Sequence, residues 1–111
     1  MDRAAGFVRP VQNQVIPVKN WYLISYDVHD EKRLKQVARL LEGRGERLQF
    51  SVFRCFLNKR ELQRLRWELS RIMDPSDDLL VVRLCPGCVA NIRNTHDRSQ
   101  WPEDPDRVSV V

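Results

Sequence analysis

Two acidic residues and a histidine lie close together after an apolar segment. Five of the six residues at 21–26 are aromatic, β-branched or leucine, which predicts a buried strand. Asp27 follows this segment directly, and His29 and Asp30 come just after it. A carboxylate at the end of a buried strand is held by rigid backbone and partly removed from water, so it can bind a hard divalent cation. Asp27 is therefore the candidate metal ligand.

His29 and Asp30 each allow a simpler interpretation. Strand residues two apart share a face, so His29 can lie on the side of Asp27 and act as a general base or metal ligand. The alternative is an ordinary histidine in a surface loop. Asp30 opens a helical pattern and is typical of an N-cap. Asp27 has no such capping role.

Cys85 and Cys88 belong to a Cys-Pro-Gly-Cys segment. This spacing occurs in zinc sites and in redox pairs. A zinc site needs four ligands, and only Cys55 and His96 remain as soft candidates nearby in the sequence. A redox pair belongs at a helix N-terminus in a thioredoxin-like βαβ unit, which the sequence does not predict here. We therefore expect a structural pair that binds no ligand.

Positive charge is concentrated in the middle of the chain. Residues 30–73 hold 12 Lys or Arg against 6 Asp or Glu, and 15 of all 19 basic residues are arginine. Arginine binds phosphate in a bidentate manner and stacks on aromatic rings, so this segment is a candidate surface for a polyanion. Helical spacing predicts a basic stripe with an inserted aromatic, formed by Arg60, Arg64, Trp67 and Arg71. The alternative is a solvated face with Trp67 at a subunit contact.

The elements that position these residues follow from apolar periodicity. Strands are predicted at 20–28, 47–57 and 78–84, helices at 30–42 and 58–73, a short helical piece at 89–92, and further strands at 93–96 and 107–111. Gly43 or Gly45 would end the first helix in a left-handed conformation. The order indicates an α+β fold, a ferredoxin-like βαββαβ-type sandwich with two helices on one face of an antiparallel sheet and an extra C-terminal strand.

The domain organisation and the assembly follow from this fold. Residues 1–19 are an N-terminal extension, residues 20–96 the ferredoxin-like domain, and residues 97–111 a loop and C-terminal strand at the dimer edge. The first and third predicted strands are apolar on both faces, and two helices shield only one face. We therefore expect a homodimer whose sheets face each other, with Asp27 of each chain near the two-fold axis.

Size and composition exclude other classes of protein. A chain of 111 residues is one domain by length, and no apolar run approaches the ~18 residues of a membrane span. The N-terminal residues lack the apolar core of a secretory signal. Three cysteines, an odd number, fit a reducing compartment. We expect a cytoplasmic protein with no membrane partner.

Three separated motifs are Tyr-Leu-Ile-Ser-Tyr-Asp-Val at 22–28, Asp-Glu-Lys-Arg at 30–33 and Leu-Gln-Phe-Ser-Val-Phe at 48–53. Together they resemble the family of CRISPR-associated protein two, the small subunit of the spacer-acquisition machinery. They occur in the family's order and spacing, and the resemblance runs from residue 21 to about residue 92.

The resemblance implies a homodimer in which the two strand-end aspartates, here Asp27, bind Mg²⁺ or Mn²⁺ for phosphodiester hydrolysis. It also implies a bridging role between copies of the larger acquisition subunit, an integrase, on duplex DNA. Around the catalytic Asp27, the family pattern places Tyr26, Ser51 and Phe53. The expected nucleic-acid contacts are Arg33, Arg47, Arg60, Arg64, Trp67 and Arg71.

Three functions are compatible with the sequence. The first is a metal-dependent endonuclease acting on RNA or DNA. The second is a non-catalytic DNA-binding scaffold of the acquisition complex. The third is a toxin-like ribonuclease, or an RNA-binding ferredoxin-like module in which Tyr26 and Phe53 stack on bases at an open sheet face.

Overall fold

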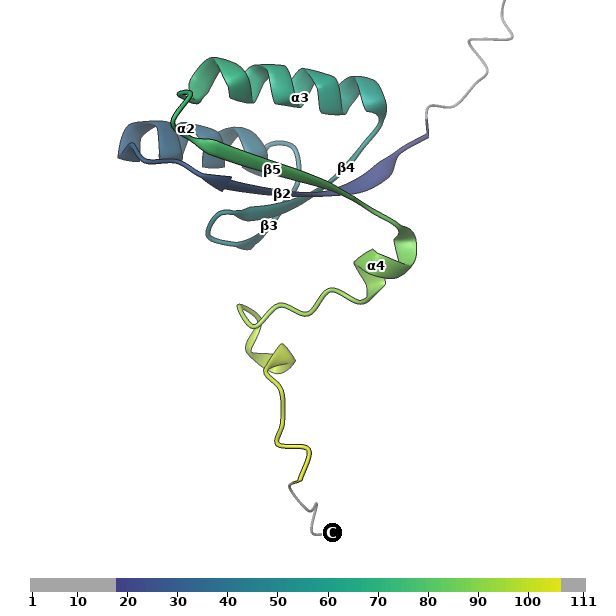
Figure 1. Ribbon diagram of the computed structural model, residues 1–111. Coiled ribbons are helices and arrows are strands. Elements are labelled where there is room, and N and C mark those ends of the chain that lie inside the picture. The colour runs from purple at the N-terminus through teal and green to yellow at the C-terminus, as the bar shows by residue number, and fades with distance from the viewer. Residues whose placement is uncertain (1–17, 107–111) are drawn as a thin grey trace, which may run out of the picture.

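The computed structural model describes residues 18–106. Within them, four strands form one sheet, and helices cover one of its faces (Figure 1). Antiparallel pairing gives the strand order β3-β4-β2-β5, which is the ferredoxin-like βαββαβ arrangement. The predicted fold class is thus confirmed. In chain order the elements are β2 (Asn20–Asp27), α2 (Glu31–Glu42), β3 (Glu46–Gln49), β4 (Val52–Leu57), α3 (Lys59–Ile72), β5 (Asp78–Leu84), α4 (Pro86–Ala90) and the 3-10 helix η1 (Arg98–Gln100).

Helices α2 and α3 cover one face of the sheet, and the core lies between the two layers (Figure 1). Alternate residues of β2 point into it, as strand geometry requires. Helix α3 contributes Leu65 and Leu69, which are both fully buried. The other core residues are Tyr22, Ile24, Tyr26, Val37, Leu41, Phe53, Cys55 and Leu57.

The predicted N-terminal caps of both helices are present. The Asp30 carboxylate accepts a hydrogen bond from the Arg33 backbone N–H at 3.0 Å. Asn58 and Glu61 form a reciprocal capping box on α3. The prediction for the end of α2 was wrong in one respect: Gly43 caps the helix with φ −78°, which is an ordinary right-handed conformation.

The predicted strand at 47–57 is two strands, and this is the main correction to the fold. The chain turns at Phe50 and Ser51, so β3 and β4 form a hairpin with a register shift between Arg47 and Gln49. The turn leaves Phe50 68% exposed and directs Phe53 into the core. The hairpin also supplies the sheet's fourth strand.

The segment at 93–96 is consequently not a strand. The Asn94 side chain binds it to the edge of β3, donating to the Leu48 carbonyl at 2.6 Å and accepting from the Gln49 amide at 3.0 Å. The short helix begins earlier than predicted, at Pro86. The expected strand at 107–111 and nearly all of the extension at 1–19 lie outside the described residues.

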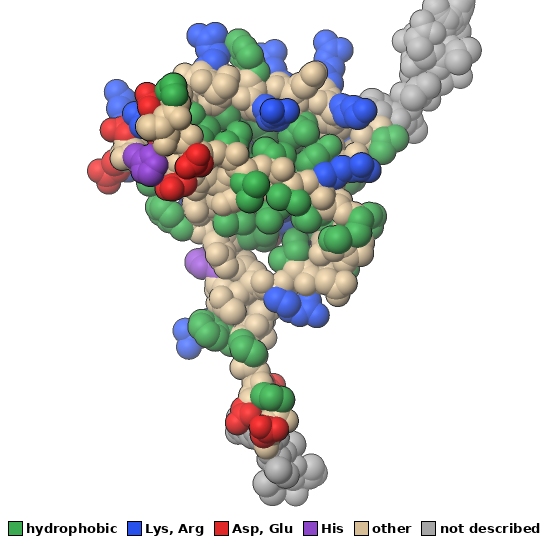
Figure 2. Space-filling model, in the orientation of Figure 1, with side chains coloured by type: hydrophobic (Ala, Val, Ile, Leu, Met, Phe, Trp, Pro, Cys, Tyr) green, Lys and Arg blue, Asp and Glu red, His purple; other side chains and the backbone are tan. Residues whose placement is uncertain are grey.

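Within residues 18–106, α2 and α3 both lie on the first face of the sheet, and we call the second face, which they do not cover, the open face. Cross-strand register places Trp21, Leu23, Phe56, Leu80 and Val82 together on it. Of these, Phe56, Leu80 and Val82 are 47%, 58% and 37% exposed. Figure 2 shows hydrophobic side chains gathered across the domain below the helices. None of the helices between residues 18 and 106 is long and apolar enough to cross a membrane.

Candidate functional site

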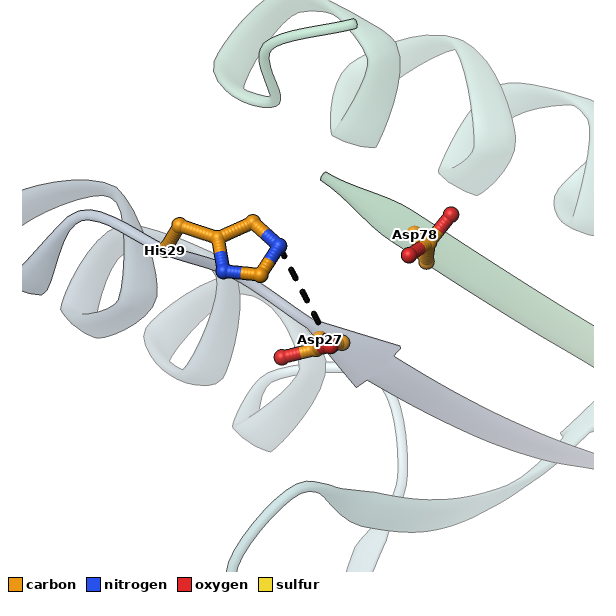
Figure 3. A group of neighbouring side chains, drawn as sticks. All are labelled: Asp27, His29 and Asp78. Atoms are coloured by element: carbon orange, nitrogen blue, oxygen red, sulfur yellow. Dashed lines mark ion pairs between the residues drawn. The ribbon is translucent and has the colours of Figure 1, made fainter. Parts of the chain in front are cut away.

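The acidic cluster lies where β2 ends and β5 begins. Asp27 and Asp78 are direct cross-strand partners, and His29 follows β2 by two residues. One ligand atom from each of the three residues lies within 4.8 Å of the others. Figure 3 shows the His29 ring directed at Asp27, with Nε2 and Oδ2 4.0 Å apart. His29 thus lies on the side of Asp27, and it is at the same time an exposed residue of the loop between β2 and α2, as the alternative interpretation holds.

The cluster is more hydrated than the sequence indicated. The Asp27 side chain is 71% exposed and that of His29 is 55% exposed, since Asp27 is the last residue of β2 and His29 lies in the loop that follows. The expectation of a partly desolvated carboxylate was wrong for the single chain. Register nevertheless places Asp27 and Asp78 on the open face, at one end of its apolar residues.

The donor set fits a divalent cation. Like charges directly opposite in an antiparallel pair destabilise a sheet, and a cation between Asp27 and Asp78 would relieve that repulsion. The spacing of 4.8 Å or less is only slightly wider than the ~4.2 Å between opposite ligands of one octahedral Mg²⁺, and these exposed side chains are free to rotate. Carboxylates suit both Mg²⁺ and Mn²⁺, whereas an imidazole ligand favours Mn²⁺, which is a transition-metal ion.

Asp77, which the sequence analysis missed, fixes this corner of the fold. Its side chain is fully enclosed and accepts hydrogen bonds from Arg33 Nε at 2.9 Å and from the backbone N–H groups of His29 and Asp74. The Arg33 hydrogen bond, helped by the backbone donors, holds the pKa of Asp77 well below its usual range. The signal in the sequence is the Asp-Pro-Ser-Asp segment at 74–77, whose composition is typical of a turn.

The ion pair with Asp77 also changes the role expected for Arg33. The sequence places Arg33 among the nucleic-acid contacts, but its guanidinium is engaged by Asp77 through both Nε and Nη2. Arg33 therefore links the start of α2 to the start of β5 in this chain. We omit it from the surface proposed below.

Tyr26, Ser51 and Phe53 do not lie with Asp27. The rings of Tyr26 and Phe53 are stacked in the helix-side core with centroids 6.2 Å apart, and the Arg47 guanidinium lies 5.1 Å from the Phe53 centroid. The Tyr26 hydroxyl donates to the Phe50 carbonyl, and burial raises the pKa of Tyr26. Ser51 contributes a carbonyl that accepts the Tyr26 backbone N–H.

This arrangement excludes one of the predicted functions. Phe53 is fully buried and Tyr26 is 5% exposed, both beneath the helices. Neither ring can stack on a base at an open sheet face. The hypothesis of an RNA-binding module that uses these two aromatic residues was wrong.

The stripe on α3 faces solvent on the opposite side of the molecule from the open face. Trp67 is 52% exposed, with the guanidinium carbons of Arg64 and Arg71 at 5.6 and 5.0 Å from its ring centroid. Arg60 and Gln63 line a shallow hollow beside Trp67. Figure 2 shows Lys and Arg side chains along the top of the view, over α3. The arrangement combines positive charge with an accessible aromatic ring.

Comparison with known proteins gives one family. The model of the CRISPR-associated protein Cas2 family matches residues 20–92. The "CRISPR-associated endoribonuclease Cas2 1" of Chloroflexus aurantiacus is 41% identical over 93 residues, which cover 82% of this chain and 99% of the relative. The "CRISPR-associated endonuclease Cas2 2" of Thermus thermophilus is 42% identical over 62 residues, or 56% of this chain and 69% of the relative.

Solved structures agree with the fold. Streptococcus pyogenes Cas2, crystallised at pH 6.5, superposes with a TM-score of 0.61 at 31% identity, over 65% of this chain and 94% of the other. A chain of a partial Cas6-RT-Cas1–Cas2 complex superposes with a TM-score of 0.59 over 83% of this chain and 98% of that one; at 24% identity this likeness concerns the fold alone.

Proposed function

The chain belongs to the Cas2 family of CRISPR-associated proteins, and on that premise we propose that it is a homodimeric, metal-dependent endonuclease of spacer acquisition. The observation that carries the proposal is the opposition of Asp27 and Asp78 across two strands, with His29 beside them. The substrate is an RNA or DNA phosphodiester, since the relatives carry both names. We also propose that the protein acts in the cytoplasm.

Asp27 and Asp78 would hold Mg²⁺ or Mn²⁺ through carboxylate oxygens, with His29 as a third ligand or as a base. The bound cation would neutralise charge on the scissile phosphate and lower the pKa of a water molecule. Asp27 keeps the His29 imidazole within 4.0 Å, and Asp77 fixes the His29 backbone. The residues of this chain therefore orient a proton acceptor beside the metal ligands.

A second copy of the chain would complete the site. The open face leaves Phe56, Leu80 and Val82 exposed to water, and burying such side chains contributes ~25 cal/mol per Å². Asp27 lies on the same face, so a partner seated there brings a second Asp27 toward the first. We therefore infer a two-fold dimer that pairs the two open faces.

Nuclease activity of Asp27→Asn tests the proposal. This variant keeps the side-chain shape but removes the charge that binds the cation. We expect cleavage of RNA and DNA substrates in Mg²⁺ or Mn²⁺ to fall by roughly two orders of magnitude. Glu103→Gln, which removes one exposed acid elsewhere, is the matched control. Unchanged cleavage by nuclease-free Asp27→Asn would overturn the proposal.

The exposed stripe favours a second candidate function, a DNA-holding scaffold that bridges copies of the larger acquisition subunit. Arg60, Arg64 and Arg71 would contact phosphates around Trp67, so duplex affinity should fall steeply with salt, with a slope of about −0.9 per phosphate contact. Spacer acquisition by Asp27→Asn separates the two functions. Loss of acquisition supports the nuclease, and retention supports the scaffold.

A further inference from the structure

Cys85 and Cys88 lie at the junction of β5 and α4, away from the acidic cluster. The four residues 85–88 are all exposed. The two cysteines are free thiols, and their sulfur atoms are 2.9 Å apart. The pair is therefore accessible to a reagent in solution and already close to the geometry of a covalent bond.

The hydrogen bonds make the two sulfurs unequal. Cys85 is the N-cap of α4, its sulfur accepts the Cys88 backbone N–H at 3.2 Å, and it also lies within hydrogen-bond distance of the Cys88 sulfur. The interaction with Cys88 lowers the pKa of Cys85, and the same contact between the two sulfurs raises the pKa of Cys88. Negative charge is thus favoured on Cys85, while Cys88 holds the proton.

The surroundings do not favour a zinc site. Cys55 is fully buried in the core, and burial raises its pKa to about 11. Within residues 18–106, neither Cys85 nor Cys88 belongs to any group of three possible metal ligands. The pair does begin a helix, contrary to our expectation from the sequence. A dithiol with one activated sulfur remains.

We propose that Cys85 and Cys88 form a thiol–disulfide exchange site whose substrate is a small-molecule disulfide. The Cys85 thiolate attacks one sulfur of that disulfide, its S–S bond breaks, and one thiolate leaves and takes up a proton. Cys88 then loses its proton and attacks Cys85 in the mixed disulfide, releasing the second thiolate, which is protonated in turn. The protein's two thiols are oxidised to one disulfide, and the small disulfide is reduced to two thiols.

Intact mass of the reduced full chain after exposure to oxidised glutathione tests this assignment. We expect the wild type to lose two hydrogens with no lasting adduct. Cys88→Ser should stop with one glutathionyl group on Cys85, because no second thiol is near. Cys85→Ser should react at least about tenfold more slowly, because Cys88 then lacks an activated neighbour.

Two controls accompany this experiment: the retained fold of Cys85→Ser and the buried thiol of Cys55. Serine is itself a good N-cap, so Cys85→Ser keeps the start of α4, and circular dichroism checks that the fold is retained. Cys55 should stay reduced in every variant because it is buried. Equal rates for the two serine variants would overturn the proposal, as would a wild type that retains the adduct. The outcome is independent of nuclease activity.

Discussion

At the scale of single residues, Asp77 is the side chain on which this corner of the fold depends. Replacement by Asn keeps its size but turns an acceptor toward Arg33 into a donor, and leaves Arg33 without its counter-ion. We predict that the melting temperature of Asp77→Asn falls by about 5 °C or more. Glu103→Gln makes the same change of charge at an exposed position and should melt like the wild type.

The ion pair between Asp77 and Arg33 predicts how the stability of the fold depends on pH. The folded pKa of Asp77 is depressed, so its contribution is complete above the unfolded value of about 3.9 and is lost as pH falls below it. Urea unfolding between pH 5 and pH 2 should show the wild type approaching Asp77→Asn as the pH decreases. A stability difference that stayed constant over this range would contradict the assignment.

The sequence indicates the strand-end position of Asp27 and the nearby His29, but not the third member of the cluster, Asp78. Asp27 follows an apolar run that is visible in the chain itself. Asp78 becomes its neighbour only through the register of β2 with β5, which pairs residues 51 positions apart. Tyr26 and Phe53 lie on the helix side of the sheet, away from Asp27, because neighbouring strand residues point to opposite faces. The sequence does not say which face the helices cover.

At the scale of elements, the β3–β4 hairpin depends on a glycine. A Cβ at Gly45 would collide with the Arg54 carbonyl and the Cys55 sulfur. We predict that Gly45→Ala lowers the free energy of unfolding by about 1–3 kcal/mol, as overpacking does. Gly43→Ala is the matched control, since a Cβ there makes only ordinary contacts and φ is −78°.

Denaturant unfolding of the two alanine variants checks this prediction. Equal stabilities would show that the hairpin shifts to make room at no cost. The helices were predictable because apolar spacing and caps are local signals. The hairpin was not, because Phe50 and Ser51 carry none of the Gly, Asn or Asp signals typical of a tight turn.

At the scale of the whole molecule, the open face predicts the oligomeric state. A charge placed on it should oppose burial, so we predict that Leu80→Glu sediments as a monomer at concentrations at which the wild type is a dimer. Trp67→Glu is the matched control, because Trp67 is similarly exposed but lies on the helix layer. A wild type that is monomeric at micromolar concentration would refute the dimer and the shared site together.

The open face of the sheet links the stability of the protein to its concentration. If folding of the open face is completed only by a second copy, apparent stability rises with the concentration of chains, by mass action. A scarce chain would spend more time with Leu80 and Val82 in water, open to wrong partners and to proteases. The rate of synthesis would then set both the amount of the protein and the lifetime of each molecule.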